Sequence, residues 1–313
     1  MKEKIIAGIY GGAIGDALGV PVEFTNREVL DKNPVTDMRE YGTYQQPKGT
    51  WSDDSSLTFC LMEGLCNGYD LEDIASKFAD WKYHSYWTPH GSVFDIGMAT
   101  RKAIYEIQKG TKPVLCGGMD EWSNGNGSLM RILPMAFYLY NEADINVRFE
   151  KVKAVSSITH AHARSVIACF IYVEYAIKLI EGFDKLEAFQ ITQKTVTKYL
   201  VDYEMNTAEV NLFHRVLKGN IGDLDRGSIS GSGYVLHSLE ASLWALLSSD
   251  SYEEAVLKAV NLGEDTDTTA AITGGIAGIY FGRNNQFDFW RAHLARFEDI
   301  EHLIERFAKA ILT

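Results

Sequence analysis

The sequence predicts an all-α fold, and three observations support this. Apolar residues recur at spacings of three and four along most of the chain, alternating strand patterns are scarce, and only six prolines interrupt the 313 residues. No stretch of biased composition divides the chain, so we expect one domain over residues 1–313 although length alone would suggest about two. We expect its helices to pack as an orthogonal bundle.

Each expected helix rests on this periodicity. Within the expected helix 162–182, Glu174 and Lys178 are spaced to pair across one turn. Gly263 is placed to close the expected helix 251–263. The last segment is amphipathic over several turns. The expected helical segments are 57–65, 96–107, 162–182, 232–249, 251–263 and 289–312.

Composition excludes several classes of protein. The net charge of −12 opposes non-specific nucleic-acid binding, which needs clustered Lys and Arg. Four cysteines without zinc-type pairing are expected to be core residues in a reducing compartment. The apolar N-terminal segment is interrupted by Asp16 and glycines and has no convincing cleavage site, and the apolar run 166–173 is too short to span a bilayer. We therefore expect a soluble, cytoplasmic protein without nucleic-acid or membrane partners.

A first acidic cluster lies in "WSDDSSL", at the start of a predicted helix. Ser52 would be its N-cap, and Asp53 and Asp54 would occupy the first turn, where the helix dipole favours negative charge. Taken alone, this cluster is most simply explained as helix capping.

A second cluster, in "GEDTDTTAAITGGIAG", is harder to explain by capping. Asp265, Asp267 and Thr268 precede small and apolar residues suited only to a buried helix, and no Lys or Arg lies between Lys258 and Arg283. Unpaired carboxylates beside a core are costly unless a cation compensates them. Carboxylate and hydroxyl ligands suit Mg²⁺, Mn²⁺ or Ca²⁺, although the spacing is not that of an EF-hand. The two clusters together favour a metal site.

Other candidate residues have simple structural explanations when each is considered alone. Glu23 would be a surface acid and Asp95 an N-cap. In "WSNGNGSLMRILP", Gly125, Asn126 and Gly127 could take positive φ and present N–H groups to an anion, with a helix N-terminus behind them, or form a plain turn.

The remaining candidates lie in two short motifs. His160 and His162 in "THAHARS" lack a third ligand and are more typical of structural hydrogen bonding than of metal binding. Tyr234, after a Gly-rich turn, is most simply a core residue, although it could also pack against a base or ribose.

Seven motifs in order resemble the ADP-ribosylglycohydrolase family, especially the group that removes ADP-ribose from arginine and includes the dinitrogenase reductase-activating glycohydrolases. They run from about residue 5 to residue 282, nearly the whole chain. The motifs are "GGAIGDALGVPVEF", "WSDDSSLT", "FDIG", "GNGSLMR", "THAH", "GYVLHSLEA" and "GEDTDTTAAITGGIAG".

The resemblance implies an all-α fold with two divalent cations, Mg²⁺ or Mn²⁺, in a central cleft. Glu23 and Asp95 match the acids near the metals and the scissile bond. Ser52 stands where many members have Thr, but it keeps the hydroxyl. The implied metal ligands are Ser52, Asp53, Asp54, Asp265, Asp267 and Thr268. The implied substrate-binding residues are Gly125, Asn126, Gly127, Ser128, Leu129 and His160 for the diphosphate and ribose, and Gly233 and Tyr234 toward the adenosine.

The hypothesis is an active hydrolase, since the inactive lens relatives have lost metal-site residues that this chain keeps. It would cleave the bond between C1″ of the distal ribose and a guanidinium nitrogen, on an ADP-ribosylated protein or a small ADP-ribosyl conjugate. The alternatives are an enzyme for O-linked ADP-ribose, from serine or O-acetyl-ADP-ribose, and a non-catalytic ADP-ribose-binding protein. A two-metal phosphoesterase is disfavoured because histidine-rich ligand sets are missing. We expect a monomer or a small homo-oligomer.

Overall fold

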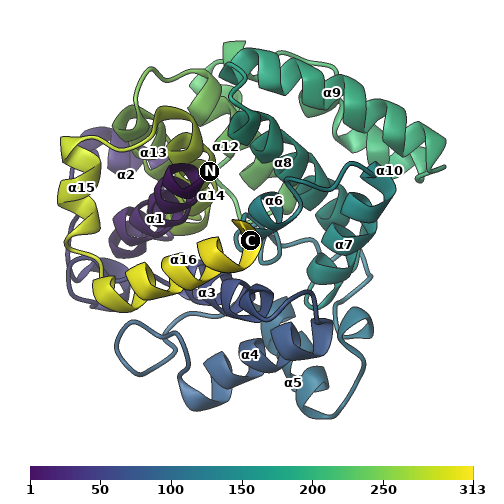
Figure 1. Cartoon of the computed structure of the whole chain (residues 1–313). Coiled ribbons are helices and arrows are strands. Elements are labelled where there is room, and N and C mark those ends of the chain that lie inside the picture. The colour runs from purple at the N-terminus through teal and green to yellow at the C-terminus, as the bar shows by residue number, and fades with distance from the viewer. Residues whose placement is uncertain (313) are drawn as a thin grey trace.

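The computed structural model describes residues 1–312, which form helices joined by turns (Figure 1). Within these residues the extended pairings are three isolated bridges, so the predicted all-α fold is confirmed. The α-helices are α1 (Lys2–Gly19), α2 (Arg27–Lys32), α3 (Asp53–Cys66), α4 (Leu71–His84), α5 (Met98–Gln108), α6 (Pro134–Tyr138), α7 (Ile145–Ser157), α8 (Ala163–Glu181), α9 (Lys185–Asp202), α10 (Thr207–Leu212), α11 (His214–Leu217), α12 (Val235–Leu247), α13 (Tyr252–Val260), α14 (Thr266–Phe281), α15 (Asn285–Arg291) and α16 (Phe297–Leu312). The short 3₁₀ helices are η1 (Val20–Val22), η2 (Gly42–Tyr44), η3 (Pro113–Leu115), η4 (Ile221–Asp223) and η5 (Arg226–Ser228).

Helices α1 and α14 lie side by side at the centre of the bundle, with their backbones in close contact (Figure 1). A Cβ added to Gly15 would lie 2.0 Å from the carbonyl oxygen of Ala270, and one on Gly19 would lie 2.3 Å from Cα of Asp267. Residue numbers rise along α1 as they fall along α14, so the two helices are antiparallel. The end of α1 therefore lies beside the start of α14.

Helix α1 is apolar because it packs at the centre of the bundle. By length and composition, the stretch Lys2–Val22 is the one helical stretch in residues 1–312 that could cross a membrane. However, 89% of its most apolar window is buried inside the protein. Burial on all sides is typical of a helix at the centre of a bundle.

Most of the predicted helices form where the periodicity placed them, and the four cysteines are free, with three of them buried. The C-terminal segment differs, because α15 ends at Arg291 and α16 starts at Phe297. Arg296 between them takes a φ of 55°, a left-handed conformation that no continuous α-helix contains. Amphipathic periodicity over 289–312 did not reveal this break. Helix α13 ends at Val260, and Gly263 follows it with a φ of 80°.

The predicted pair between Glu174 and Lys178 is wrong. Glu174 is buried and faces α7, where Arg148 contacts both of its carboxylate oxygens at 2.6 and 2.9 Å. Lys178 instead contacts Glu181 at 2.8 Å near the surface. The spacing within α8 is right for pairing, but a facing helix offers the buried carboxylate a better partner.

Candidate active site

Four chain segments bring carboxylates to one end of the α1–α14 pair. Asp16 lies near the end of α1, Glu23 follows η1, Asp54 lies in the first turn of α3, and Asp267 lies in the first turn of α14. The two acidic clusters of the sequence meet directly, because the Thr268 hydroxyl donates to Oδ2 of Asp54 at 3.2 Å. Residues more than 200 positions apart therefore form one site.

The capping interpretation of the first cluster is confirmed, and it is compatible with a site. Ser52 is the N-cap of α3, and its hydroxyl accepts the Asp54 N–H at 3.3 Å and donates to Oδ2 of Asp54 at 2.9 Å. Asp265 occupies the N-cap position of α14, but its side chain makes no capping bond. Its carboxylate instead accepts from the amide of Asn126 at 2.8 Å.

Several carboxylate oxygens in this region are buried without a hydrogen-bond partner. They are Oε2 of Glu23, Oδ1 of Asp54 and Oδ2 of Asp267. Oxygens of Asp16, Asp54 and Asp267 lie within 4.8 Å of one another, and so do oxygens of Glu23, Asp265 and Asp267. Buried, unpartnered carboxylate oxygens at this spacing are the donor set that hard divalent cations require. The residues present thus fit a metal centre, and Asp267 belongs to both groups.

The electrostatics of the cluster agree with this fit. Burial and then the charge of Asp95 raise the pKa of Glu23 to about 8. Burial and neighbouring carboxylates raise the pKa values of Asp53, Asp54 and Asp267 well above their usual range. The strongest charges acting on Asp267 are those of other carboxylates. A bound cation would supply the positive charge that these groups lack.

Glu23 and Asp95 both differ from the simple structural roles expected for them. Glu23 is not a surface acid, since only 6% of it is exposed. Asp95 is not an N-cap, because α5 begins at Met98 with Gly97 in the N-cap position. The Tyr44 side chain lies close to both Glu23 and Asp95, where its hydroxyl partly opposes the rise in the pKa of each acid. Sequence reasoning missed Tyr44, which lies in the single-turn 3₁₀ helix η2, within a stretch without periodic pattern.

Asp16 is the second residue that sequence reasoning missed. Its carboxylate is fully buried and accepts from the Ser52 N–H at 2.9 Å, the Ser55 N–H at 3.0 Å and the Ser55 hydroxyl at 2.6 Å. These bonds fix the start of α3, which carries Asp53 and Asp54. Its position inside an apolar segment, where burial of a lone acid is costly, was the available signal.

The "GNGSL" segment lies beside these acids, but its glycines do not take the positive φ that was one of the two conformations considered for them. Neither Gly125 nor Gly127 takes a positive φ, and no helix begins directly behind them, since α6 starts at Pro134. A Cβ on Gly127 would lie 2.7 Å from Cε1 of His160, so glycine is required here by close approach. The Asn126 N–H donates to the Gly233 carbonyl at 3.1 Å.

His160 and His162 have different roles. His160 is buried, and its Nδ1 lies 2.9 Å from the Thr159 hydroxyl, which also accepts from Arg131 at 2.8 Å. Burial and the nearby Arg131 charge lower the His160 pKa to about 3, so the imidazole is neutral. His162 caps α8 by accepting the Arg164 N–H at 3.2 Å, in line with a structural histidine.

The Gly-rich turn before α12 completes the site. Gly125 and Tyr234 form an antiparallel bridge, and the Val235 N–H donates to the Asn124 carbonyl at 3.0 Å. A Cβ on Gly233 would lie 2.7 Å from Oδ2 of Asp265. Tyr234 is half-buried and packs edge-on against His237. The structure thus brings the predicted binding segments into contact with the second acidic cluster.

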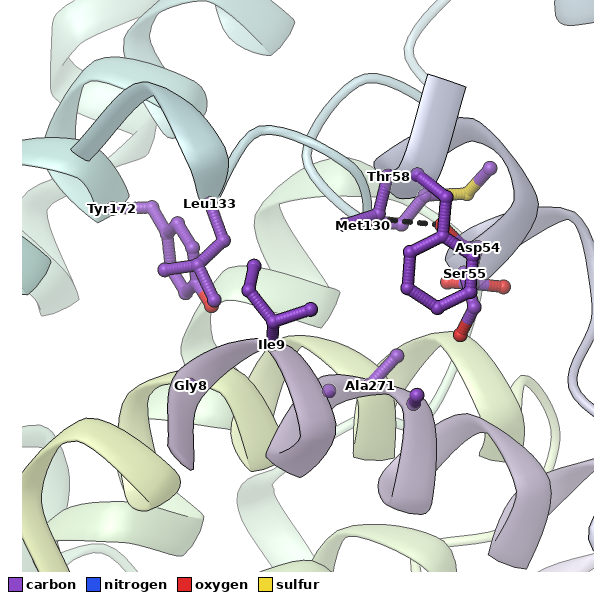
Figure 2. Close-up of a pocket in the computed structure, with 12 residues that line it drawn as sticks. Gly8, Ile9, Asp54, Ser55, Thr58, Met130, Leu133, Tyr172 and Ala271 are labelled. Atoms are coloured by element: carbon purple, nitrogen blue, oxygen red, sulfur yellow. Dashed lines mark hydrogen bonds between the residues drawn. The ribbon is translucent and has the colours of Figure 1, made fainter. Parts of the chain in front are cut away.

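A small cavity of about 20 Å³ lies behind Asp54, between α1, α3 and α14 (Figure 2). Figure 2 shows Asp54, Ser55 and Thr58 on one side of it and Leu133 and Tyr172 on the other. This volume is enough for about one water molecule. A larger hollow of about 430 Å³ beside α9 and α10 is lined by none of the carboxylates of this cluster.

Fold and site together define an all-helical protein with a buried cluster of carboxylates at the meeting point of three helices. A sequence model of the ADP-ribosylglycohydrolase family matches residues 1–313. The chain therefore belongs to the ADP-ribosylglycohydrolase family, and it is a hydrolase.

Individual relatives agree with this assignment. ADP-ribosylarginine hydrolase Tri1 of Serratia proteamaculans (strain 568) is 30% identical over 306 residues, which cover 97% of this chain and 78% of the relative. ADP-ribosyl-[dinitrogen reductase] glycohydrolase of Rhodospirillum rubrum is 26% identical and covers 100% of this chain and 96% of its own. A solved structure described as an ADP-ribosylglycohydrolase-related protein complex superposes with a TM-score of 0.80 at 26% identity, covering 99% of this chain and 98% of that one.

Proposed function

We propose that this glycohydrolase requires divalent cations and removes ADP-ribose from arginine or a related guanidinium acceptor by cleaving the C1″–N bond. The observation that carries the metal requirement is the pair of carboxylate groups that share Asp267 and keep unpartnered buried oxygens. The arginine acceptor is supported by two relatives, 30% and 29% identical, that are named ADP-ribosylarginine hydrolase Tri1.

The aspartates of the two groups would hold Mg²⁺ or Mn²⁺, with the hydroxyls of Ser52 and Thr268 beside them and Glu23 left for proton transfer. Asp53 lies next to this set and interacts with Asp95, so its place among the ligands stays a prediction. When bound, the cations would orient the ribose and the attacking water and lower the pKa of that water.

The other residues of the site have binding and proton-transfer roles. Asn126 contacts both Asp265 and the Gly233 segment, so it couples the proposed diphosphate and ribose region to the acids. His160 is neutral and can act only as a hydrogen-bonding group near neutral pH. During hydrolysis the water loses a proton and the departing nitrogen gains one. Glu23 or Asp95 would move these protons, because both lie in the acidic site and a carboxyl pKa near working pH suits this role.

The test is release of free ADP-ribose from ADP-ribosyl-arginine and ADP-ribosyl-serine peptides, with Mg²⁺ or Mn²⁺ and after EDTA. We expect release from the arginine peptide, lost in EDTA and restored by added cation. Release from serine alone would replace the proposed acceptor with an O-linked one. Release that persists unchanged in EDTA would contradict the metal requirement, and binding without turnover of either peptide would favour a binding protein.

A further inference from the structure

Three aromatic residues lie next to Glu23 and Asp95, two of them as neighbours in the chain and the third in space. Phe24 directly follows Glu23 and Phe94 directly precedes Asp95, while Tyr44 lies close enough to affect the pKa of both acids. The Tyr44 and Phe94 ring centroids are 5.0 Å apart, and those of Phe24 and Tyr44 are 6.4 Å apart. The rings therefore form a continuous apolar wall next to two carboxyl groups.

The backbone holds this wall in place. The Phe24 φ of 61° is unusual for a bulky residue, and the Phe24 N–H donates to the Glu264 carbonyl at 2.6 Å. The Thr43 hydroxyl donates to the Glu23 carbonyl at 2.8 Å. Although its backbone is fixed, 68% of Phe24 is exposed. A strained, anchored backbone that presents a phenyl ring to solvent is not explained by core packing.

We propose that Phe24, Tyr44 and Phe94 form the acceptor subsite, which receives the guanidinium group of the arginine that carries ADP-ribose. This inference rests on the proposed function and identifies the residues that select the leaving group. A guanidinium is flat, positively charged and weakly hydrated, so it stacks on aromatic faces and pairs with carboxylates. Glu23 and Asp95 supply the carboxylates, and the three rings supply the faces.

The same wall offers little to the alternative acceptor. The oxygen-linked carbon chain of serine is neutral and has no planar face, so it gains neither the cation–π contact nor the ion pair. The Tyr44 hydroxyl affects the pKa of both acids, so Tyr44 has a second role as a positioning residue for them. Phe24 and Phe94 have no such second role and report on stacking alone.

The experiment compares wild type, Phe24→Leu and Phe94→Leu in kcat/KM for an ADP-ribosyl-arginine peptide and in Kd for ADP-ribose, which lacks the acceptor. We expect each substitution to lower kcat/KM about tenfold, the loss typical of one desolvated cation–π contact, and to leave the Kd of ADP-ribose within about twofold. Phe281→Leu, at the far end of α14 and roughly 20 Å from its acidic start, is the matched control and should change neither value.

Two results would overturn the subsite. One is kcat/KM within about twofold of wild type in both variants, and the other is an equal loss in ADP-ribose affinity, which would place the rings at the ADP-ribose. If wild type does not cleave the arginine peptide, the proposed function fails separately. The Kd of the intact peptide relative to ADP-ribose then tests the subsite: a preference for the peptide that Phe24→Leu abolishes supports it, and no preference refutes it.

Discussion

The molecule buries carboxylates in two regions with opposite electrostatic solutions. Between α7 and α8, Glu174 is 1% exposed and contacts the Arg148 guanidinium through both oxygens. At the junction of α1, α3 and α14, Asp54 and Asp267 are also 1% exposed, yet each keeps an oxygen without a partner. Equally buried carboxylates therefore have their charge compensated by an arginine in one region and left uncompensated in the other.

This difference separates structural from functional acids more clearly than burial does. A buried carboxylate with its own Arg is part of the folded scaffold, and removing either partner leaves an isolated charge. A buried cluster of like charges opposes folding unless protons or cations bind. Retaining such a cluster makes sense if the chain binds cations there, which is the proposal for Asp54 and Asp267.

The largest expected effect is on activity at the uncompensated region. Asp267→Asn removes the carboxylate shared by both groups while keeping its shape, and we expect ADP-ribose release to fall on the order of 10³-fold, about 4 kcal/mol of transition-state stabilisation. The melting temperature in EDTA should not fall, because one repulsive charge is gone. Activity assays and calorimetry check this. Activity close to wild type would show that the shared carboxylate is not needed for catalysis.

In the compensated region between α7 and α8, removing a carboxylate should lower stability and leave activity unchanged. Glu174→Gln leaves the partly buried Arg148 beside a neutral group, and we expect a loss of about 3 kcal/mol in the free energy of unfolding with unchanged kcat. Glu181→Gln, which breaks the more exposed pair with Lys178, is the control and should cost at most about 1 kcal/mol. Denaturant titrations measure both. A drop in kcat for folded Glu174→Gln would mean that the two regions are coupled.

The sequence was sufficient to predict the all-α class, most of six helical segments and both acidic clusters, since periodicity and capping patterns are local. It could not identify Asp16, whose role depends on the start of α3 lying 36 residues further along the chain. Tyr44 was missed because only the folded chain brings η2 close to Glu23 and Asp95. The requirement for glycine at position 127 could not be explained in advance, because sequence does not distinguish a left-handed glycine from one that makes room for His160.

Asp16 itself allows an intermediate test of the uncompensated region. Asp16→Asn keeps the shape but weakens the acceptor for three donors on Ser52 and Ser55, and it removes a member of one carboxylate group. We expect a 10- to 100-fold loss of Mn²⁺ affinity, roughly the effect of changing a residue that supports metal ligands. Titration with Mn²⁺ followed by electron paramagnetic resonance measures it. Ser55→Ala, which removes one donor, should lose less, and an equal or larger loss would argue against a role for the Asp16 charge.

The smallest expected effect is a dependence of thermal stability on pH that cations should suppress. Burial raises the pKa of Asp16 to about 6, and burial with the Asp95 charge raises that of Glu23 to about 8, both above the values of an unfolded chain. An acid with a raised folded-state pKa contributes stability at low pH that is lost as pH rises through that pKa. In EDTA the melting temperature should therefore fall by a few degrees between about pH 5.5 and pH 8.5.

Bound Mg²⁺ or Mn²⁺ favours the ionised carboxylates, so the melting temperature with cation should exceed that in EDTA by an amount that grows with pH. Differential scanning calorimetry at matched ionic strength gives both curves. Asp54→Asn should make the EDTA curve flatter, because it removes one of the repelling charges, whereas Glu181→Gln should leave both curves unchanged in slope. If the curves with and without cation stay parallel across this range, the cluster carries no charge that a cation compensates. The contrast with the Glu174–Arg148 pair would then say nothing about function.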